Sequence, residues 1–78
     1  MKLTTISNSA RVLDMAEFSI LFSYETPVAV HIIGSHFLIT EVYHSRTTSK
    51  HIGLFAPKDA VREIVPQERI DNVIYECL

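Results

Sequence analysis

The middle of the chain alternates between hydrophobic and polar residues in three runs, and this pattern predicts three β-strands. The runs cover residues 18–24, 28–33 and 36–44. The residues between the first two runs, 25–27, end in a proline, and Gly34-Ser35 separates the last two. Proline, glycine and serine are typical of turns because they set or tolerate the backbone angles that turns need. The chain therefore predicts a three-stranded antiparallel β-meander.

The requirement for one shared apolar face predicts the lengths of the two loops. A three-residue loop at 25–27 places Phe22 opposite Val30, whereas a two-residue loop there would turn serines to the core. A two-residue loop at Gly34-Ser35 places Val30 opposite Ile39. The turn from Tyr24 to Pro27 is interpreted as holding this register rather than as a recognition tip. The expected apolar face consists of Phe18, Ile20, Phe22, Tyr24, Val28, Val30, Ile32, Phe37 and Ile39, and the other, mixed face includes His31, His36, Leu38, Thr40, Val42 and His44.

Two helices are predicted after the strands. Residues 47–49 offer threonine and serine side chains that can cap a helix near 48–54. Pro66 and Glu68 are typical of a first helical turn, and they predict a helix over 67–77. Its apolar stripe is Ile70, Val73, Ile74 and Cys77. We expect both helices to pack on the apolar face of the meander.

Two segments leave alternatives open. Residues 3–6 fit a short strand, whereas residues 7–17 fit one or two helical turns capped by serine or asparagine. Residues 61–65 fit either a strand or a helical turn that starts near Pro57. Either segment would add a fourth strand. The predicted fold class is α+β, in one small domain that spans residues 1–78.

Composition adds an expectation about partners and compartment. The chain of 78 residues is 47% hydrophobic, and its mean hydropathy of +0.20 is high for a small domain, which favours a homodimer or a protein partner. A net charge of −2 argues against a general nucleic-acid binder. The single cysteine, Cys77, cannot form an internal disulfide, and neither a signal peptide nor a membrane-spanning run is visible. We therefore expect a cytoplasmic protein without a membrane partner.

Two short segments resemble a known group of proteins. The run Ser-Tyr-Glu-Thr-Pro-Val-Ala at residues 23–29 is followed by Thr-Thr-Ser-Lys-His at residues 47–51. The pair resembles the SYxTPVA and TTSKH segments of a family of small uncharacterised proteins encoded mostly by bacteriophages and other mobile elements. The resemblance implies a small α+β protein in the cytoplasm of a bacterial host. It implies no assigned activity, cofactor or catalytic residue.

The polar segment from His44 to His51 is the candidate site for binding an anion or a partner. A helix that begins here presents free N–H groups beside hydroxyls and cationic side chains, which together suit a phosphate or a carboxylate. The alternative is that Thr47 or Thr48 only caps the helix and the charged groups are solvated. The candidate residues are Tyr43, Arg46, Thr47, Thr48, Ser49, Lys50 and His51.

Signals for catalysis are weak. The chain has no GxSxG motif, and its two glycines do not form a phosphate-binding loop. His31 and His36 lie near each other on the expected mixed face, but no cysteine or acidic residue there completes a metal site. We expect no enzymatic activity, no cofactor and no metal. The sequence favours a protein–protein interaction module that acts by binding, and the alternative is a weak nucleic-acid or phosphate binder through the segment from His44 to His51.

Overall fold

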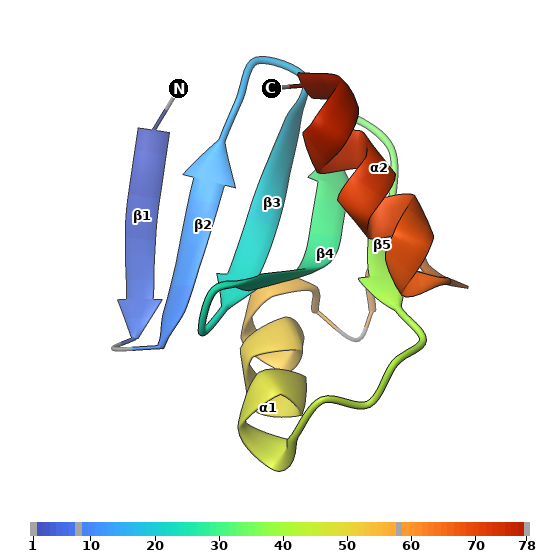
Figure 1. The fold of residues 1–78 in the computed structure, drawn as a ribbon. Coiled ribbons are helices and arrows are strands. Elements are labelled where there is room, and N and C mark those ends of the chain that lie inside the picture. The colour runs from blue at the N-terminus through green and yellow to red at the C-terminus, as the bar shows by residue number, and fades with distance from the viewer. Residues whose placement is uncertain (1, 8, 58, 78) are drawn as a thin grey trace.

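The computed structural model describes residues 2–7, 9–57 and 59–77, which form a six-stranded sheet and two helices (Figure 1). Strands follow one another across the sheet in the order of the sequence, and all neighbours are antiparallel except β5 and β6, which are parallel. The predicted α+β class is confirmed. The elements are β1 (Lys2–Ser7), β2 (Ala10–Asp14), β3 (Phe18–Ser23), β4 (Thr26–Ile32), β5 (Phe37–Thr40), α1 (Arg46–Phe55), β6 (Arg62–Val65) and α2 (Gln67–Cys77).

The sheet is wider than the predicted three or four strands because both ambiguous segments are extended. Residues 3–6 lie in β1 and residues 62–65 in β6, and the helical alternative for residues 7–17 is wrong. In β2, Ala10 and Val12 point to the buried side and Arg11 between them is exposed. This period of two is the pattern of a strand, and pairing with β3 selects it over the helical turn.

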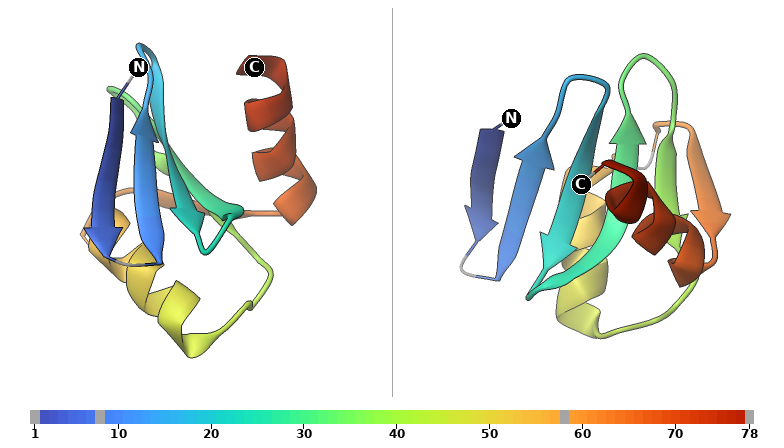
Figure 2. Two further views of the ribbon diagram at one scale, coloured as in Figure 1. Left: turned by 60° about the vertical axis from the view of Figure 1, so that its left-hand side comes forward. Right: turned by 45° about the horizontal axis from the view of Figure 1, so that its top comes forward.

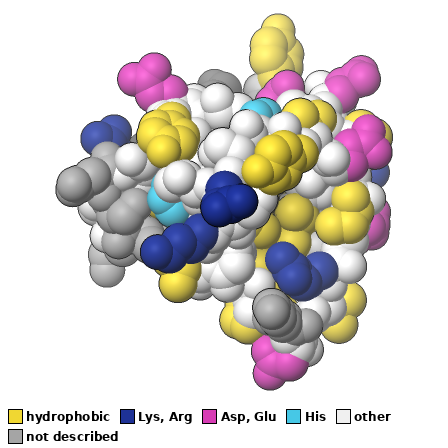
Figure 3. Space-filling view, turned by 90° about the horizontal axis from the view of Figure 1, so that it is seen from below, with side chains coloured by type: hydrophobic (Ala, Val, Ile, Leu, Met, Phe, Trp, Pro, Cys, Tyr) yellow, Lys and Arg dark blue, Asp and Glu magenta, His cyan; other side chains and the backbone are white. Residues whose placement is uncertain are grey.

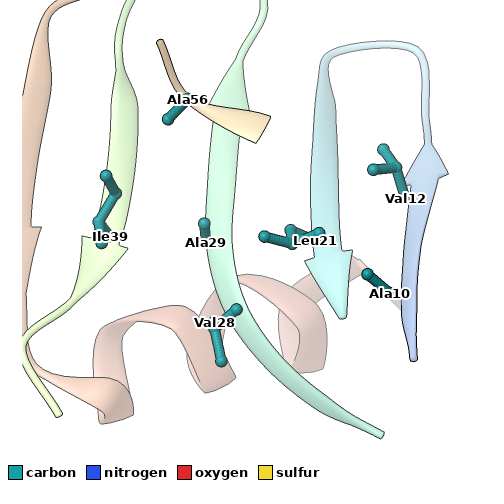
Figure 4. Close-up of a cluster of buried hydrophobic side chains, with 7 residues drawn as sticks. All are labelled: Ala10, Val12, Leu21, Val28, Ala29, Ile39 and Ala56. Atoms are coloured by element: carbon teal, nitrogen blue, oxygen red, sulfur yellow. The ribbon is translucent and has the colours of Figure 1, made fainter. Parts of the chain in front are cut away.

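The two helices lie on opposite faces of the sheet, so the prediction that both pack on one face is wrong (Figure 2). Helix α1 packs on the back face, over β3 and β4, and α2 packs on the front face, over β4 and β5. The physical reason is that the central strands are apolar on both sides, so each side needs its own cover. The back core consists of Ala10, Val12, Leu21, Val28, Ala29, Ile39 and Ala56 (Figure 4), and the front core of Ile20, Val30, Leu38, Val65 and Ile70.

The first hairpin keeps Ile20 and Val30 on one face, as predicted, but by a different register, and Val28, predicted on the same face, lies in the back core. Ser23 pairs with Thr26, so the loop is the two residues between them and the predicted three-residue loop is wrong. A bulge then shifts the register between Leu21 and Phe22, and Phe22 faces a proline instead of Val30. Because the bulge inserts one residue, the rest of β3 and β4 keeps its apolar residues on common faces. The resulting pairs are Phe18 with Ile32, Ile20 with Val30 and Leu21 with Ala29.

The second hairpin has a longer loop than predicted. The N–H of Ile32 donates to the carbonyl of His36, 3.0 Å away, so three residues form the loop. Gly34, at its centre, has a φ of 80°, which is the left-handed conformation that glycine adopts at low cost. One extra loop residue reverses the faces of β5, so Val30 pairs with Leu38 and the predicted pairing with Ile39 is wrong.

The helices lie close to their predicted positions. Helix α1 begins two residues earlier than predicted, and α2 covers the predicted range. Ile70 is fully buried, and Val73 and Ile74 pack beside it, as the apolar stripe predicts. The side chain of Cys77 lies outside the described residues. Neither helix in the described parts of the chain is long and apolar enough to cross a membrane.

The two glycines provide a matched test of the second hairpin. A Cβ at Gly34 or at Gly53 would meet no atom within 4 Å, so only the backbone conformation distinguishes them. We expect Gly34→Ala to lower the free energy of unfolding by about 1–2 kcal/mol because alanine resists a positive φ. Gly53→Ala, in α1, should raise it by about 0.5–1 kcal/mol. Urea unfolding measures both, and equal effects of the two substitutions would contradict the assigned loop.

Candidate functional site at the start of helix α1

Helix α1 is capped by a residue that lies before the predicted capping segment. Ser45 has extended backbone angles, with φ −169° and ψ 168°, and its side-chain oxygen accepts a hydrogen bond from the backbone N–H of Thr48 at 3.1 Å. Ser45 is therefore the N-cap, and neither Thr47 nor Thr48 has that role. The side chain of Thr48, in the first turn of the helix, points into the protein instead.

Thr48, His51 and Ser23 form a buried polar cluster between α1 and β3. The side-chain oxygen of Ser23 lies 2.9 Å from Oγ1 of Thr48 and 2.9 Å from Nδ1 of His51. Ser23 is only 2% exposed, Thr48 3% and His51 4%. Thr48 and His51 share one side of α1 because they are three residues apart, and Ser23 ends β3 on the back face of the sheet. The cluster joins the two segments, 23–29 and 47–51, that stand apart in the sequence.

The hydrogen bonds of this cluster hold α1 on the sheet. A serine hydroxyl at 2.9 Å from an imidazole nitrogen has the spacing of a nucleophile and its general base. Ser23 is almost completely covered, and its hydroxyl is shared with Thr48. Ser45 adds a further hydrogen bond, to Oγ1 of Thr48 at 3.1 Å. A buried, satisfied network of this kind fixes the position of α1 on the sheet.

The turn that follows Ser23 has an unusual backbone conformation. Tyr24 has a φ of 59°, which is rare for a large side chain. Its N–H donates to the carbonyl of Ser9 at 2.6 Å, and the N–H of Glu25 donates to the carbonyl of Ser23 at 3.0 Å. The Tyr24 ring lies 6.1 Å from the ring of His51 and is 55% exposed. The turn therefore holds an exposed aromatic ring beside the start of α1.

A polar hollow lies between this turn and the first turn of α1. Its volume is about 350 Å³. It is lined by Ser23, Tyr24, Thr26, His44, Ser45, Thr47 and Thr48. Hydroxyl groups predominate in this lining, so the hollow suits a polar group that accepts and donates hydrogen bonds.

The structure divides the predicted site residues into two groups. Thr48 and His51 are buried, and they support the surface rather than form it. The other five, which are Tyr43, Arg46, Thr47, Ser49 and Lys50, are exposed. In the described parts of the chain, neither Arg46 nor Lys50 has an acidic partner within ion-pairing distance. Figure 3 looks at the end of the molecule where α1 lies, and it shows Lys and Arg side chains in the central part of this face.

Sequence reasoning missed two members of the arrangement, Ser23 and Ser45. The signal for Ser45 was present, since it stands three residues before a threonine at the start of a polar helix. No local signal predicted that Ser23 is buried, because a serine on the more polar face of an alternating strand ordinarily faces water. Its burial depends on α1, which covers the back face.

The histidines of the predicted mixed face have separate partners. His31 stacks on Phe37, with ring centroids 4.1 Å apart, and Nε2 of His36 lies 3.4 Å from the carboxylate of Glu63. Among the described residues, no group of three or more histidine, cysteine, aspartate and glutamate side chains is placed to hold a metal ion.

Comparison with known proteins identifies a family. Residues 1–72 match the model of a family described as a family of unknown function, DUF8033. No curated protein and no solved structure matches the chain at a significant level.

The buried polar cluster predicts a measurable coupling between β3 and α1. We expect Ser23→Ala to lower the free energy of unfolding by about 1–3 kcal/mol, because it leaves buried polar atoms of α1 without a partner. In a double-mutant cycle with Thr48→Val, the coupling should be about 0.5–3 kcal/mol. Ser49→Ala, on the exposed side of the same helix, should change stability by less than about 0.5 kcal/mol. Additive effects of the first two substitutions in urea unfolding would contradict the cluster.

Proposed function

We propose a binding function for this chain, which belongs to the family of unknown function DUF8033. In this proposal the protein acts by occupying a surface of a protein partner, without catalysing a reaction. The observation that carries the proposal is the buried polar cluster, because it joins the Tyr24 turn and the start of α1 into one surface. We call this the α1 surface, and it consists of Tyr24, Tyr43, Arg46, Thr47 and Lys50.

The construction of the α1 surface supports a role in recognition. A binding surface is most effective when its exposed side chains stand on a rigid support. Here Ser23, Thr48 and His51 supply that support from beneath. Strained backbone such as that of Tyr24 persists only where surrounding contacts hold it, and such residues cluster at functional sites.

The composition of the α1 surface suggests the chemistry of the partner. Tyr43 is 72% exposed and Tyr24 is 55% exposed, and tyrosine and arginine dominate the energetics of many protein interfaces. Arg46 and Lys50 are exposed on α1, one turn apart, and neither has an ion pair to the described residues. We infer that the partner presents carboxylates to these two cations and apolar groups to the tyrosines.

The genetic origin and the cellular compartment of the protein are part of the same proposal. We propose that the protein is encoded by a bacteriophage or another mobile element and acts in the cytoplasm of the bacterial host. The resemblance of residues 23–29 and 47–51 to phage proteins supports this origin. A chain with a single cysteine, Cys77, also suits a reducing compartment.

Paired charge variants test the proposal. We expect the tagged protein to retain a stoichiometric partner from a bacterial lysate, and Arg46→Ala with Lys50→Ala to abolish that retention because the acidic groups of the partner lose their counter-charges. Arg62→Ala with Arg69→Ala removes two exposed cations from β6 and α2 and should have no effect. Quantitative mass spectrometry of the eluates, with thermal melts as a folding check, gives the comparison. The proposal fails if no stoichiometric partner is retained or if both double variants behave alike.

Binding of phosphate groups is a second candidate for the α1 surface. The observation in its favour is that the first turn of α1 has no acidic residue, while Arg46 and Lys50 are exposed on this helix, and Arg46 stands between Ser45 and Thr47, which line the polar hollow. Free N–H groups at a helix N-terminus attract phosphate oxygens. The net charge of −2 limits such binding to this local surface.

Salt dependence separates this candidate from the first. A labelled single-stranded oligonucleotide should bind more weakly as salt rises, with the slope of log K against log salt reduced by about 1 for each of Arg46→Ala and Lys50→Ala. Fluorescence anisotropy between low and physiological salt measures the slope. Binding that is absent, or that does not change with salt, removes nucleic acid as a ligand.

A further inference from the structure

The first strand, β1, forms one edge of the sheet, and its outer side is open. Within the described parts of the chain, β1 pairs with β2 alone, and no strand or helix lies beyond it (Figure 1). From Leu3 to Ser7 the strand has no charged residue, no proline and no glycine, and its threonines and isoleucine favour an extended chain. An edge of this kind is a template for pairing with another strand.

The strand at the other edge, β6, is protected against such pairing. It has four residues, whereas β1 has six. Arg62 and Glu63 are charged and exposed, and Pro66 follows the strand directly. Short length, exposed charge and proline are the features by which natural sheets prevent association at their edges. In β1 the only such feature is Lys2 at its start, so the two edges differ in what they allow.

Hydrogen bonds of the neighbouring hairpin show which main-chain groups of β1 face outward. The N–H of Met15 donates to the carbonyl of Phe18 at 2.8 Å. Bond directions alternate along an antiparallel strand, so the odd-numbered residues of β2 bond to β3 and the even-numbered ones bond to β1. The register pairs these even-numbered residues with positions 2 and 4 of β1. The N–H and C=O groups of Leu3 and Thr5 therefore point to the open edge.

The side chains at the same two positions are exposed on the front of the sheet. Leu3 is 58% exposed although it is a large hydrophobic residue, and Thr5 is also exposed. Leu3 lines a hollow on the front of the sheet, of about 780 Å³, whose lining also includes Arg11, Phe22 and Glu25. A strand added at this edge would place its own side chains beside Leu3.

The sequence of β1 fits an antiparallel copy of itself. Hydrogen bonds across the edge require outward residues to face outward residues, so Leu3 of each copy lies opposite Thr5 of the other. Residue 4 then faces its own copy, which joins two threonines in a favourable cross-strand pair, and Lys2 faces Ile6. No like charges oppose each other in this register. The same construction at β6 would place Glu63 opposite Glu63.

We propose that β1 pairs with β1 of a second copy of this chain, in an antiparallel and two-fold symmetric arrangement. The two sheets then form one continuous sheet, in which Leu3 and Thr5 of both copies complete their main-chain hydrogen bonds. The interface is isologous, because the same strand serves both copies. Main-chain hydrogen bonds supply its affinity, and its buried area is at the low end for protein interfaces, so the dimer exchanges with the monomer.

A proline at the open edge tests the dimer. Sedimentation equilibrium at increasing concentration should approach twice the chain mass of 8.9 kDa. Thr5→Pro removes an outward N–H from each copy and should raise the dimer Kd by about tenfold or more. Ile64→Pro is the matched control, because the carbonyls of Val61 and Val65 face β5, which leaves the N–H of Ile64 on the open side of β6. It should leave the Kd unchanged, and circular dichroism reports the folding of both variants.

Disulfide crosslinking tests the register. In a Cys77→Ser background, Thr4→Cys should form a linked dimer on mild oxidation, because the two copies of residue 4 have Cα atoms about 4.5 Å apart, which suits a disulfide. Thr5→Cys should stay unlinked, since each copy of residue 5 lies opposite residue 3. Non-reducing gel electrophoresis compares the two variants.

Three results would each overturn the proposal. They are a monomeric wild-type protein, equal dimer Kd values for the two proline variants, and crosslinking of Thr4→Cys that is absent or no more efficient than that of Thr5→Cys. These outcomes are independent of the proposed binding function, since no residue of the α1 surface is changed.

Discussion

The architecture depends on β3 and β4 being apolar on both faces. Leu21 and Ala29 supply the back core, and Ile20 and Val30 supply the front core. Burying both faces of the same strands requires a helix on each side, which places α1 behind the sheet and α2 in front. A single layer of helices would leave one of these cores in water.

Apolar contact covers the back face, and hydrogen bonds determine where α1 sits on it. Ser23, at the end of β3, forms hydrogen bonds with two side chains of α1, those of Thr48 and His51. Apolar packing alone tolerates small sliding movements, whereas a buried hydrogen bond penalises them, because displaced partners lose their bonds without gaining water. The network therefore fixes the position of the Tyr24 turn relative to the start of α1, and the proposed binding function depends on this relative position.

The α1 surface differs in physical character from the front of the sheet. The α1 surface is polar and cationic, and it adjoins a hollow rich in hydroxyl groups. The hollow on the front of the sheet is mixed, because Leu3 and Phe22 line it together with Arg11 and Glu25. Tyr24 lies at the border of the two, since it belongs to the α1 surface and also lines this hollow.

Local signals in the sequence were sufficient to predict the α+β class, the position of α2, the existence of α1 and the extended conformation of the central strands. These features follow from periodicity and from proline, threonine and serine at helix starts, which act over a few residues. Ser45 could also have been recognised as the N-cap, since its signal is equally local.

The tertiary structure decided what depends on partners distant in the sequence. The loop lengths of both hairpins were predicted on the assumption that the sheet buries only one apolar face. The sheet buries a core on each face, so that assumption does not hold. The bulge beside Phe22 and the extra residue in the loop around Gly34 then determined which side chains face each helix. For the same reason the burial of Thr48 and His51 against Ser23 could not be foreseen, because it depends on the packing of α1 over β3. The sequence alone thus determined the central strands, the two helices and the polar segment, and packing across the sheet determined which residues of that segment are buried and which are exposed.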